Sequence, residues 1–227
     1  MKVTYFGHSS FLIETQDKKL LFDPFITPNN LAKDINVDAI KADYILVSHA
    51  HSDHTSDLLT VAKSTGATVI SIFEIISWLE NHGMDKVHPM NIGGKWAFDF
   101  GTVKMVAATH SSSFPDGTYG GLATGFILEI AGRTIYYAGD TSLTQDMKLI
   151  GELYKIDLAF LPIGDNFTMG VEDAIIASSF IKCNNIIGMH YDTFGYIKIN
   201  HDEAVQKFKN EELNLRLLEI GKQEELF

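Results

Sequence analysis

Short apolar or alternating runs recur along this chain, and runs of this kind predict strands. Most of them are bounded by glycine, proline or small polar residues, which favour turns. The predicted strands cover residues 3–6, 10–15, 19–23, 44–48, 68–71, 95–98, 102–107, 123–130, 133–138, 158–161 and 185–189, and an edge strand is expected at 215–218.

Apolar residues recur at helical spacing in five further segments. Ser142 with Gln145, and Asn200 with Glu203, have the spacing of an N-terminal capping box, so a helix is expected to open at each pair. The predicted helices cover residues 56–64, 74–82, 142–153, 171–182 and 200–210.

The order of these elements indicates an α/β (α+β) fold. A strand-rich meander comes first, strands and helices then alternate, and the same order follows again, so we expect sheets covered by helices. Segments 43–49 and 157–165 share an aspartate, a buried strand and a polar loop. No Ser/Gly tract or long charged run separates the halves, so residues 1–227 are expected to form one domain.

Composition and charge narrow the classes of partner. Hydrophobic residues make up 45% of the chain and charged residues 21%, which fits a globular protein with a core. The net charge is 18 − 29 = −11, and no Lys/Arg cluster is present, so no nucleic-acid partner is expected. The negative net charge does not exclude an anionic small-molecule substrate, because bound metal ions would make the electrostatic potential at the site positive.

The chain carries neither a disulfide pair nor a membrane-spanning pattern. Its single cysteine, Cys183, lies in an apolar helical stretch and is expected to be a small core residue. The first residues run directly into a strand-like segment without a signal peptide, and no run approaches the ~18 apolar residues of a membrane span. We therefore expect a cytoplasmic protein without a membrane partner, and a homo-oligomer remains open.

The most chemically specific stretch is the loop at 49–54. Three imidazoles and a carboxylate fall within six residues, directly after the apolar run 44–47. Imidazole nitrogens and carboxylate oxygens are ligands that Zn²⁺ and similar cations prefer. This loop therefore predicts part of a metal site through His49, His51, Asp53 and His54.

Three more candidate ligands each follow a predicted strand. They are His110, Asp140 and His190. A single histidine after a strand is more often a hydrogen-bonded structural residue, and Asp140 alone could cap a turn. Together with the loop at 49–54 they provide the roughly seven ligands that a dinuclear centre needs, and strand ends can bring them to one edge of the sheets.

In this order the seven residues resemble the metallo-β-lactamase superfamily. Within it, the chain is similar to bacterial and archaeal metal-dependent hydrolases related to ascorbate-6-phosphate lactonase. The motifs that carry this closer resemblance lie at residues 7–13, 23–25, 137–141, 161–170 and 190–194. The resemblance covers essentially the whole chain and implies a four-layer αββα sandwich with metals at one edge of two sheets.

The resemblance also implies how the ligands are divided. A first ion would be held by His49, His51 and His110, and a second by Asp53, His54 and His190, with Asp140 bridging them. Two divalent cations per chain are therefore expected. The nitrogen-rich ligand set favours Zn²⁺, and the lactonase resemblance makes Mn²⁺ an alternative.

The function implied is hydrolysis of a small-molecule ester, lactone or phosphodiester by a metal-bridging hydroxide. Asp140, Asp53 and His8 are the predicted catalytic residues, and His8 could equally be a structural turn histidine. Other polar residues beside the site-forming loops could bind substrate, orient ligands or simply face solvent. These are Asn166, Thr168 and Tyr191.

The remaining histidines and the loop at 114–121 have simpler expectations. His82, His88 and His201 lie away from the motifs and are expected at the surface of helices or loops. The loop at 114–121, rich in glycine, is expected to be flexible and could act as a lid.

Three other functions are compatible with parts of the pattern. A metal-dependent nuclease acting on RNA is the main alternative, although the net charge of −11 disfavours it. A di-iron oxidoreductase would typically carry an acidic residue where this chain has His51. A non-catalytic scaffold would be expected to lack some ligands, whereas all seven residues are present.

Overall fold

The structure is a computed structural model that describes residues 1–15 and 17–227. The chain forms two compact units, each built from segments that are distant in sequence. Unit 1 comprises Met1–Ile92, Ser111–Ala123 and Glu219–Phe227, and unit 2 comprises Gly93–His110 and Thr124–Leu218. Each unit contains one seven-stranded mixed sheet.

The sheet of unit 1 has the strand order β14-β1-β2-β3-β4-β5-β6. The pairs from β14 to β3 are antiparallel, and those from β3 to β6 are parallel. Its strands are β1 (Lys2–Gly7), β2 (Ser10–Glu14), β3 (Lys19–Phe22), β4 (Tyr44–Leu46), β5 (Thr68–Ile72), β6 (Val87–Met90) and β14 (Gln223–Glu225).

The sheet of unit 2 has the strand order β7-β8-β9-β10-β11-β12-β13. Its pairs are antiparallel from β7 to β10 and parallel from β10 to β13. Its strands are β7 (Lys95–Phe98), β8 (Gly101–Ala107), β9 (Thr124–Ile130), β10 (Arg133–Tyr137), β11 (Leu158–Pro162), β12 (Asn185–Met189) and β13 (Asn214–Arg216).

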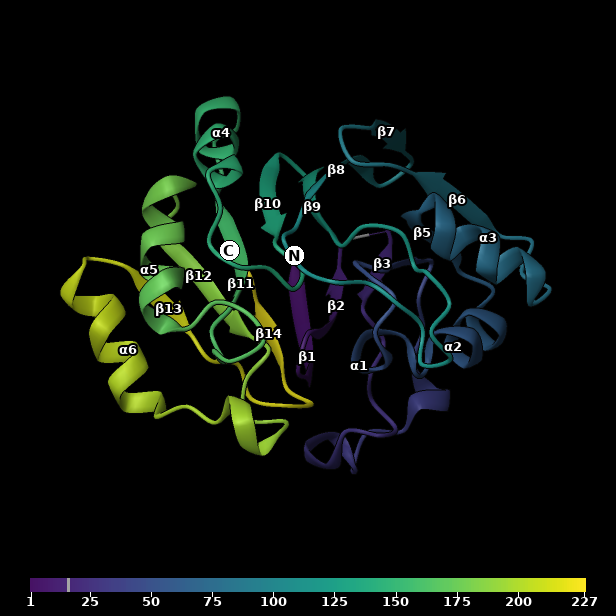
Figure 1. The fold of residues 1–227 in the computed structure, drawn as a ribbon, viewed down its shortest axis with the longest axis horizontal. Helices are drawn as coiled ribbons and strands as arrows, with labels where there is room; N and C mark the ends of the chain where they lie inside the picture. Colours follow the sequence, from purple (N-terminus) through teal and green to yellow (C-terminus); the bar gives the residue numbers. More distant parts are fainter. Residues whose placement is uncertain (16) are drawn as a thin grey trace. The chain divides into compact units, whose positions relative to one another are not determined.

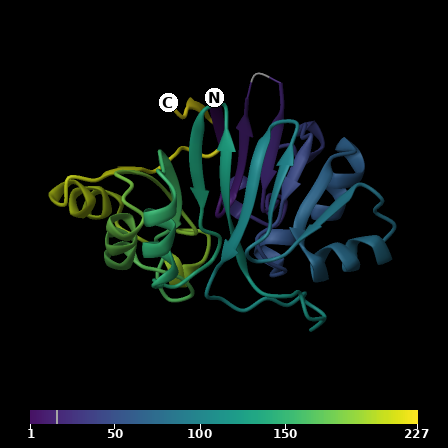
Figure 2. The same ribbon diagram turned by 90° about the horizontal axis from the view of Figure 1, so that it is seen from above.

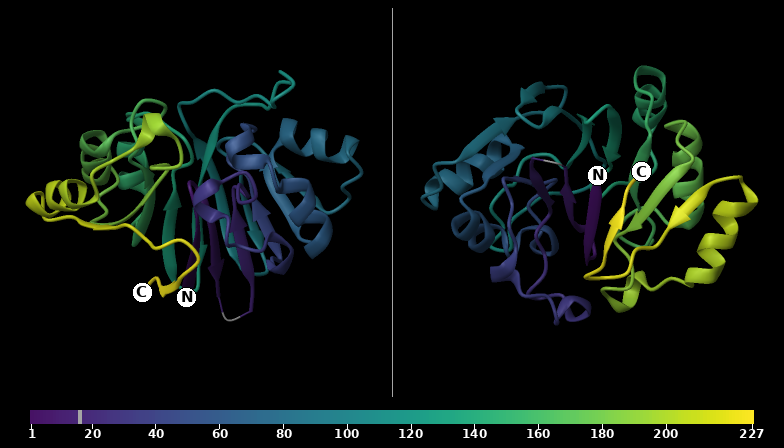
Figure 3. Two further views of the ribbon diagram at one scale, coloured as in Figure 1. Left: turned by 90° about the horizontal axis from the view of Figure 1, so that it is seen from below. Right: turned by 180° about the vertical axis from the view of Figure 1, so that it is seen from behind.

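The two sheets therefore repeat one pairing pattern, as the similar halves of the sequence predict. The strands β1 to β6 correspond in order and direction to β8 to β13. The edge strand beside β8 in unit 2 is β7, which comes directly before β8 in the sequence. The corresponding edge strand beside β1 in unit 1 is the C-terminal strand β14 (Figure 3). The strand at which pairing changes from antiparallel to parallel is β3 in unit 1 and β10 in unit 2.

Helices lie beside the parallel part of each sheet (Figure 1). In unit 1, α3 contacts β5 and β6; in unit 2, α5 contacts β11 and α6 contacts β13. Figure 2 shows α4, α5 and α6 gathered beside the parallel strands of unit 2. The helices are α1 (Ser52–Thr55), α2 (Leu58–Thr65), α3 (Phe73–Asn81), α4 (Asp146–Leu153), α5 (Val171–Phe180) and α6 (His201–Asn210), with short 3₁₀ turns η1 (Asn30–Ala32), η2 (Val37–Ala39) and η3 (Gly195–Ile197).

Burial follows the strand pattern. Strand β11 is buried throughout, as expected for a parallel strand covered on both faces. Cys183 is buried as predicted, and burial raises the pKa of its thiol to about 11. Among the described residues, no helix is long and apolar enough to cross a membrane.

Most predicted elements are present, and several details differ. Ser142 does not open a helix, because α4 begins at Asp146 after Gln145. The Asn200 cap is confirmed, since its side chain accepts a hydrogen bond from Glu203 N. Strands β6 and β14 were not predicted, and His88 lies half-buried in β6 rather than at the surface of a helix or loop.

Candidate metal centre

The loop after β4 carries the four candidate ligands of unit 1. His49 and His51 precede α1, whereas Asp53 and His54 lie in its single turn. His49 Nε2 lies 3.0 Å from His51 Nδ1, and the two rings are nearly perpendicular. His49 and His54 are fully buried, and their ring centroids lie 4.1 Å apart. The loop therefore gathers several nitrogen ligands at one point.

A buried carboxylate, Asp23, orients two of these imidazoles. Its Oδ2 atom accepts a hydrogen bond from Ser48 Oγ at 2.7 Å and lies 2.9 Å from His54 Nδ1. Its Oδ1 atom accepts from Ser48 N at 2.7 Å. Ser48 Oγ also lies 3.0 Å from His49 Nδ1. Asp23 thus reaches His54 directly and His49 through one hydroxyl.

These contacts assign the tautomers of His49 and His54. Ser48 has one hydroxyl proton, which forms the hydrogen bond to Asp23, so the Ser48 oxygen accepts a hydrogen bond from His49 Nδ1–H. The Asp23 carboxylate likewise accepts from His54 Nδ1–H. In both rings the Nε2 atom is then the one with a lone pair, and this is the form in which imidazole binds a metal.

The donor set of unit 1 fits a divalent transition metal. Two nitrogens bound to one tetrahedral zinc at about 2.0–2.1 Å would lie about 3.3 Å apart. The observed separation between His49 Nε2 and His51 Nδ1 is 3.0 Å, close to that value. His8, Asp53 and His54 also offer ligand atoms within 4.8 Å of one another. The chemistry and spacing of these residues therefore suit a metal.

His8 is held against Asp53. It is fully buried between β1 and β2, with a left-handed φ of 58°, and its Nε2 atom lies 3.0 Å from Asp53 Oδ2. Its carbonyl accepts a hydrogen bond from Tyr5 at 3.0 Å. Left-handed conformations are costly for a residue with a Cβ and tend to occur at functional sites. This geometry allows His8 to fix the orientation of the Asp53 carboxylate.

The three candidate ligands of unit 2 also meet. Asp140 Oδ2 lies 2.9 Å from His190 Nε2 and 3.6 Å from His110 Nε2. Asp140 and His190 are almost fully buried, and His190 has a left-handed φ of 57°. Thr141 helps to hold this arrangement, because its Oγ1 atom accepts a hydrogen bond from Thr109 N, next to His110. One carboxylate oxygen therefore faces two imidazoles.

Asp23 and Asp140 occupy corresponding positions in the repeated sheets. Asp23 directly follows β3 and Asp140 lies just after β10, the strands at which each sheet changes from antiparallel to parallel pairing. Ligand sites in mixed sheets gather at such strand ends. The sequence analysis missed the role of Asp23, although an aspartate directly after a strand was a usable signal.

The segment after His110 approaches the loop of unit 1. Ser111 Oγ lies 3.3 Å from His51 Nε2, and Ser112 Oγ accepts a hydrogen bond from Ala50 N. Phe114 is buried and stacks on Trp78 of α3 with ring centroids 4.2 Å apart. The expected lid is therefore anchored at its start, and its flexibility stays a prediction.

The predicted substrate-binding residues differ in accessibility. Asn166 is exposed, with a left-handed φ of 55°, and Thr168 is half-buried. Tyr191 directly follows His190 but is 5% exposed, and its ring packs edge-on against His201. His201 is a surface residue as expected, and its Nε2 atom lies 2.6 Å from Asp192 Oδ2.

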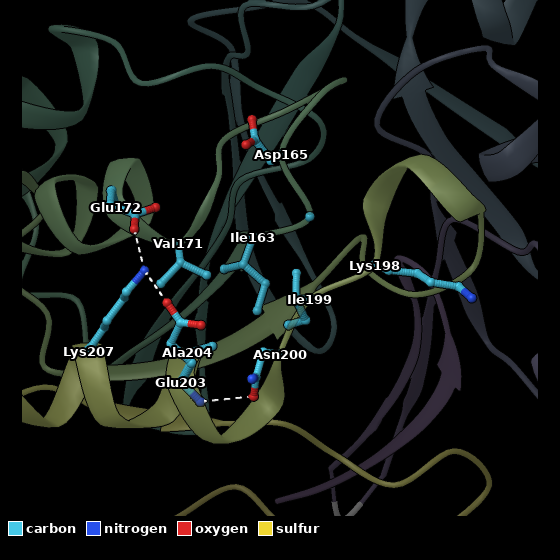
Figure 4. A pocket seen from close by; sticks show the side chains of 11 residues that line it. Ile163, Asp165, Val171, Glu172, Lys198, Ile199, Asn200, Glu203, Ala204 and Lys207 are labelled. Atoms are coloured by element: carbon cyan, nitrogen blue, oxygen red, sulfur yellow. Dashed lines mark hydrogen bonds and ion pairs between the residues drawn. The ribbon is translucent and has the colours of Figure 1, made fainter.

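A cavity in unit 2 lies beside α5 and α6 (Figure 4). Lys207 Nζ lies 2.6 Å from a carboxylate oxygen of Glu172 and 2.8 Å from one of Glu203. The hydrogen bond from Lys207 lowers the pKa of the Glu172 carboxyl. Within the described residues its lining contains none of the candidate ligands, although Gly164 in its wall packs against His190. The ion pair between Lys207 and Glu172 in this cavity links α6 to α5.

We expect Asp23→Asn to weaken metal binding by about 10- to 100-fold, because the amide replaces an acceptor of Ser48 or His54 with a donor. Metal affinity measured by competition with a chromophoric chelator checks this. Asp57→Asn is the matched control, since Asp57 is also buried in unit 1, but its carboxylate accepts hydrogen bonds from the backbone N–H groups of Ile26 and Thr27. Equal affinities in the two variants would contradict the orienting role.

Comparison with known proteins identifies the family. Residues 2–190 match the family model described as "Beta-lactamase superfamily domain". A UPF0173 metal-dependent hydrolase of Flavobacterium johnsoniae is 56% identical over 226 residues, which covers 100% of both chains. The chain belongs to the UPF0173 metal-dependent hydrolases. Another member, from Christiangramia forsetii, is 55% identical over 227 residues, with 100% of both chains covered.

The fold of the UPF0173 family is also found in a solved structure. Igni18, a metallo hydrolase of the archaeon Ignicoccus hospitalis, matches with a TM-score of 0.88 and 36% identity. The match covers 98% of this chain and 96% of that chain. The predicted α/β class and metallo-β-lactamase fold are thereby confirmed, as is the resemblance to the metallo-β-lactamase superfamily.

Proposed function

We propose that this protein is a dinuclear metal-dependent hydrolase of a small-molecule ester, lactone or phosphodiester. The observation that carries the proposal is the fixed tautomer state of His49 and His54, which leaves the Nε2 lone pairs for a metal. The proposed ligands are five histidines and two aspartates: His49, His51, Asp53, His54, His110, Asp140 and His190.

The proposed division of ligands is the one that the resemblance to the metallo-β-lactamase superfamily implies. We propose that His49, His51 and His110 bind one ion, that Asp53, His54 and His190 bind the other, and that Asp140 contributes to both. Five imidazoles favour Zn²⁺, with Mn²⁺ as the alternative. When bound, two such ions would supply hydroxide at neutral pH and polarise the bond to be cleaved.

The protein residues position and hold the reacting groups. The Asp140 carboxylate, which faces His190 and His110, is proposed to accept a proton from the attacking water. Asp23 and Ser48 hold two imidazoles in one orientation, and His8 holds Asp53. Preorganised ligands of this kind avoid the cost of reorganisation during the reaction.

The proposed substrate is small and is not a nucleic acid. A net charge of −11 repels a phosphate backbone, which normally requires basic clusters. Asn166 and Thr168 are proposed to contact substrate, and Tyr191 to support His190 from a buried position.

Elemental analysis of purified protein should find close to two divalent ions per chain. The same sample should hydrolyse at least one member of a panel of lactones, esters and phosphodiesters, assayed with Zn²⁺ and Mn²⁺ separately. Removal of metal by a chelator should abolish this activity, and adding the ion back should restore it. Full activity in metal-free protein would refute the proposal.

A further inference from the structure

Two exposed aromatic side chains meet on the surface of unit 2. Phe167 is 51% exposed and Tyr196 is 78% exposed, and their rings form an edge-to-face pair with centroids 6.2 Å apart. Phe194, on the same loop as Tyr196, is also exposed. Single exposed aromatics are ordinary, but several aromatic side chains grouped on one surface indicate a recognition surface. We call Phe167 and Tyr196 the aromatic pair.

The loop that carries Phe167 is stiffly held. Asp165 and Asn166 both have left-handed φ angles, 64° and 55°. Asp165 N donates to Met169 O, and Asn166 N donates to Asp165 Oδ1. Met169 is fully buried, so the loop is closed by backbone bonds and anchored by an apolar side chain. This closure fixes the backbone from which Phe167 projects.

The loop that carries Tyr196 is held in a similar way. Asp192, at a left-handed φ of 62°, donates its N–H to Ile197 O and accepts from Ile199 N through its side chain. Ile197 is fully buried directly after Tyr196. Two exposed rings therefore stand on backbones that are already ordered, which lowers the entropy cost of binding a ligand.

Both loops start from or touch the candidate ligands of unit 2. The loop of Tyr196 follows His190 directly, and Gly164, before the loop of Phe167, packs against the carbonyl of His190. Met169 N donates to the carbonyl of Thr141, the residue after Asp140. The aromatic pair is thus connected through short backbone paths to both buried ligands.

We propose that the aromatic pair binds a flat apolar group of the substrate, such as a phenyl ring, away from the bond that is hydrolysed. Edge-to-face rings offer an aromatic face and an aromatic edge, and both attract another ring. This inference rests on the proposed hydrolase function and adds a substrate class to it: esters or lactones that carry an apolar ring.

A small ligand suits this surface better than a second copy of the chain. A stable protein interface buries about 800 Å² and some 20–30 residues on each partner. The described aromatic surface of these loops consists of Phe167, Phe194 and Tyr196. Two copies that each carry a net charge of −11 would also repel one another.

The test compares matched esters in metal-loaded enzyme. For methyl phenylacetate, the double variant Phe167→Ala/Tyr196→Ala should raise KM about tenfold with kcat nearly unchanged. For methyl acetate, which lacks the ring, KM should change less than about twofold. Trp96→Ala is the control, because Trp96 is an exposed aromatic of unit 2 that lies on β7, far in strand order from β11 and β12.

A binding measurement separates this inference from the proposed function. Phenylacetate should bind metal-free protein, measured by saturation-transfer NMR, and the double variant should weaken that binding about tenfold whereas Trp96→Ala should not. If no lactone, ester or phosphodiester of the panel is hydrolysed by unmodified enzyme, the proposed function fails while phenylacetate binding still tests the aromatic pair. Unchanged phenylacetate binding in the double variant, or loss of self-association in sedimentation without any change in ligand binding, would overturn the inference.

Discussion

The Asp140→Ala variant should lose about 10³-fold or more in kcat/KM on the best substrate. Asp140 is buried, and a single oxygen of its carboxylate faces His190 at 2.9 Å and His110 at 3.6 Å. Removing it takes away the proposed common ligand and the proposed proton acceptor. Metal-dependent charge stabilisation amounts to several kcal/mol in a transition state, and each 1.36 kcal/mol corresponds to about tenfold in rate.

Folding must be measured beside activity to interpret this loss. Circular dichroism should show an intact fold, and elemental analysis should show fewer than two ions per chain. Asp146→Ala is the control, since it removes an exposed carboxylate from the same unit at the start of α4. An Asp140→Ala variant with normal turnover would show that this carboxylate is dispensable.

The Gly164→Ala variant should lose both stability and activity, although residue 164 is not among those proposed to contact substrate. A Cβ at this position would lie 2.0 Å from the carbonyl oxygen of His190 and 3.0 Å from Ile197 Cβ. Backbone atoms cannot rotate away, so the His190 loop must shift. Overpacking costs about 1–3 kcal/mol, and a displacement of about 1 Å at a reacting group can cost roughly 10²-fold in rate.

The melting temperature of Gly164→Ala should therefore fall by roughly 2–12 °C, and its metal content should fall with it. Gly195→Ala is the matched control for these two measurements. It adds the same methyl group in unit 2, but a Cβ there has no neighbour within 4 Å. A Gly164→Ala protein that melts and binds metal like the control would show that the His190 loop tolerates the shift.

The repeated sheets explain why the candidate ligands follow strands throughout the chain. Asp23 and Asp140 follow the corresponding strands β3 and β10, and His8 and His110 follow the corresponding strands β1 and β8. In unit 1, Asp23 faces His54, and in unit 2, Asp140 faces His190, each at 2.9 Å. Each unit thus contains a carboxylate–imidazole contact, through Nδ1 of His54 in unit 1 and Nε2 of His190 in unit 2, although these histidines follow strands that do not correspond, β4 and β12.

Local patterns were sufficient to predict most elements and ligand types. The parallel strands are continuous apolar runs, and the loop 49–54 carries four candidate ligands within six consecutive residues. Both the strands and these ligands can therefore be recognised from neighbouring residues alone. The helix start at Ser142 was wrong because α4 begins after Gln145, even though the capping spacing is present. Strand β14 has too few apolar residues for its own pattern to reveal it, and pairing with β1 defines it.

The amino-acid sequence by itself determined the metal-ligand chemistry, the strand ends that carry it and the membership in a hydrolase family. Only the tertiary structure decided which residues orient those ligands and which rings meet. Asp23 reaches His54 across 31 positions of the chain, His8 reaches Asp53 across 45, and Phe167 meets Tyr196 from a separate loop. The physical reason is that residue types and periodicity are local properties, whereas hydrogen bonds between distant residues exist only after the sheet has aligned its strands.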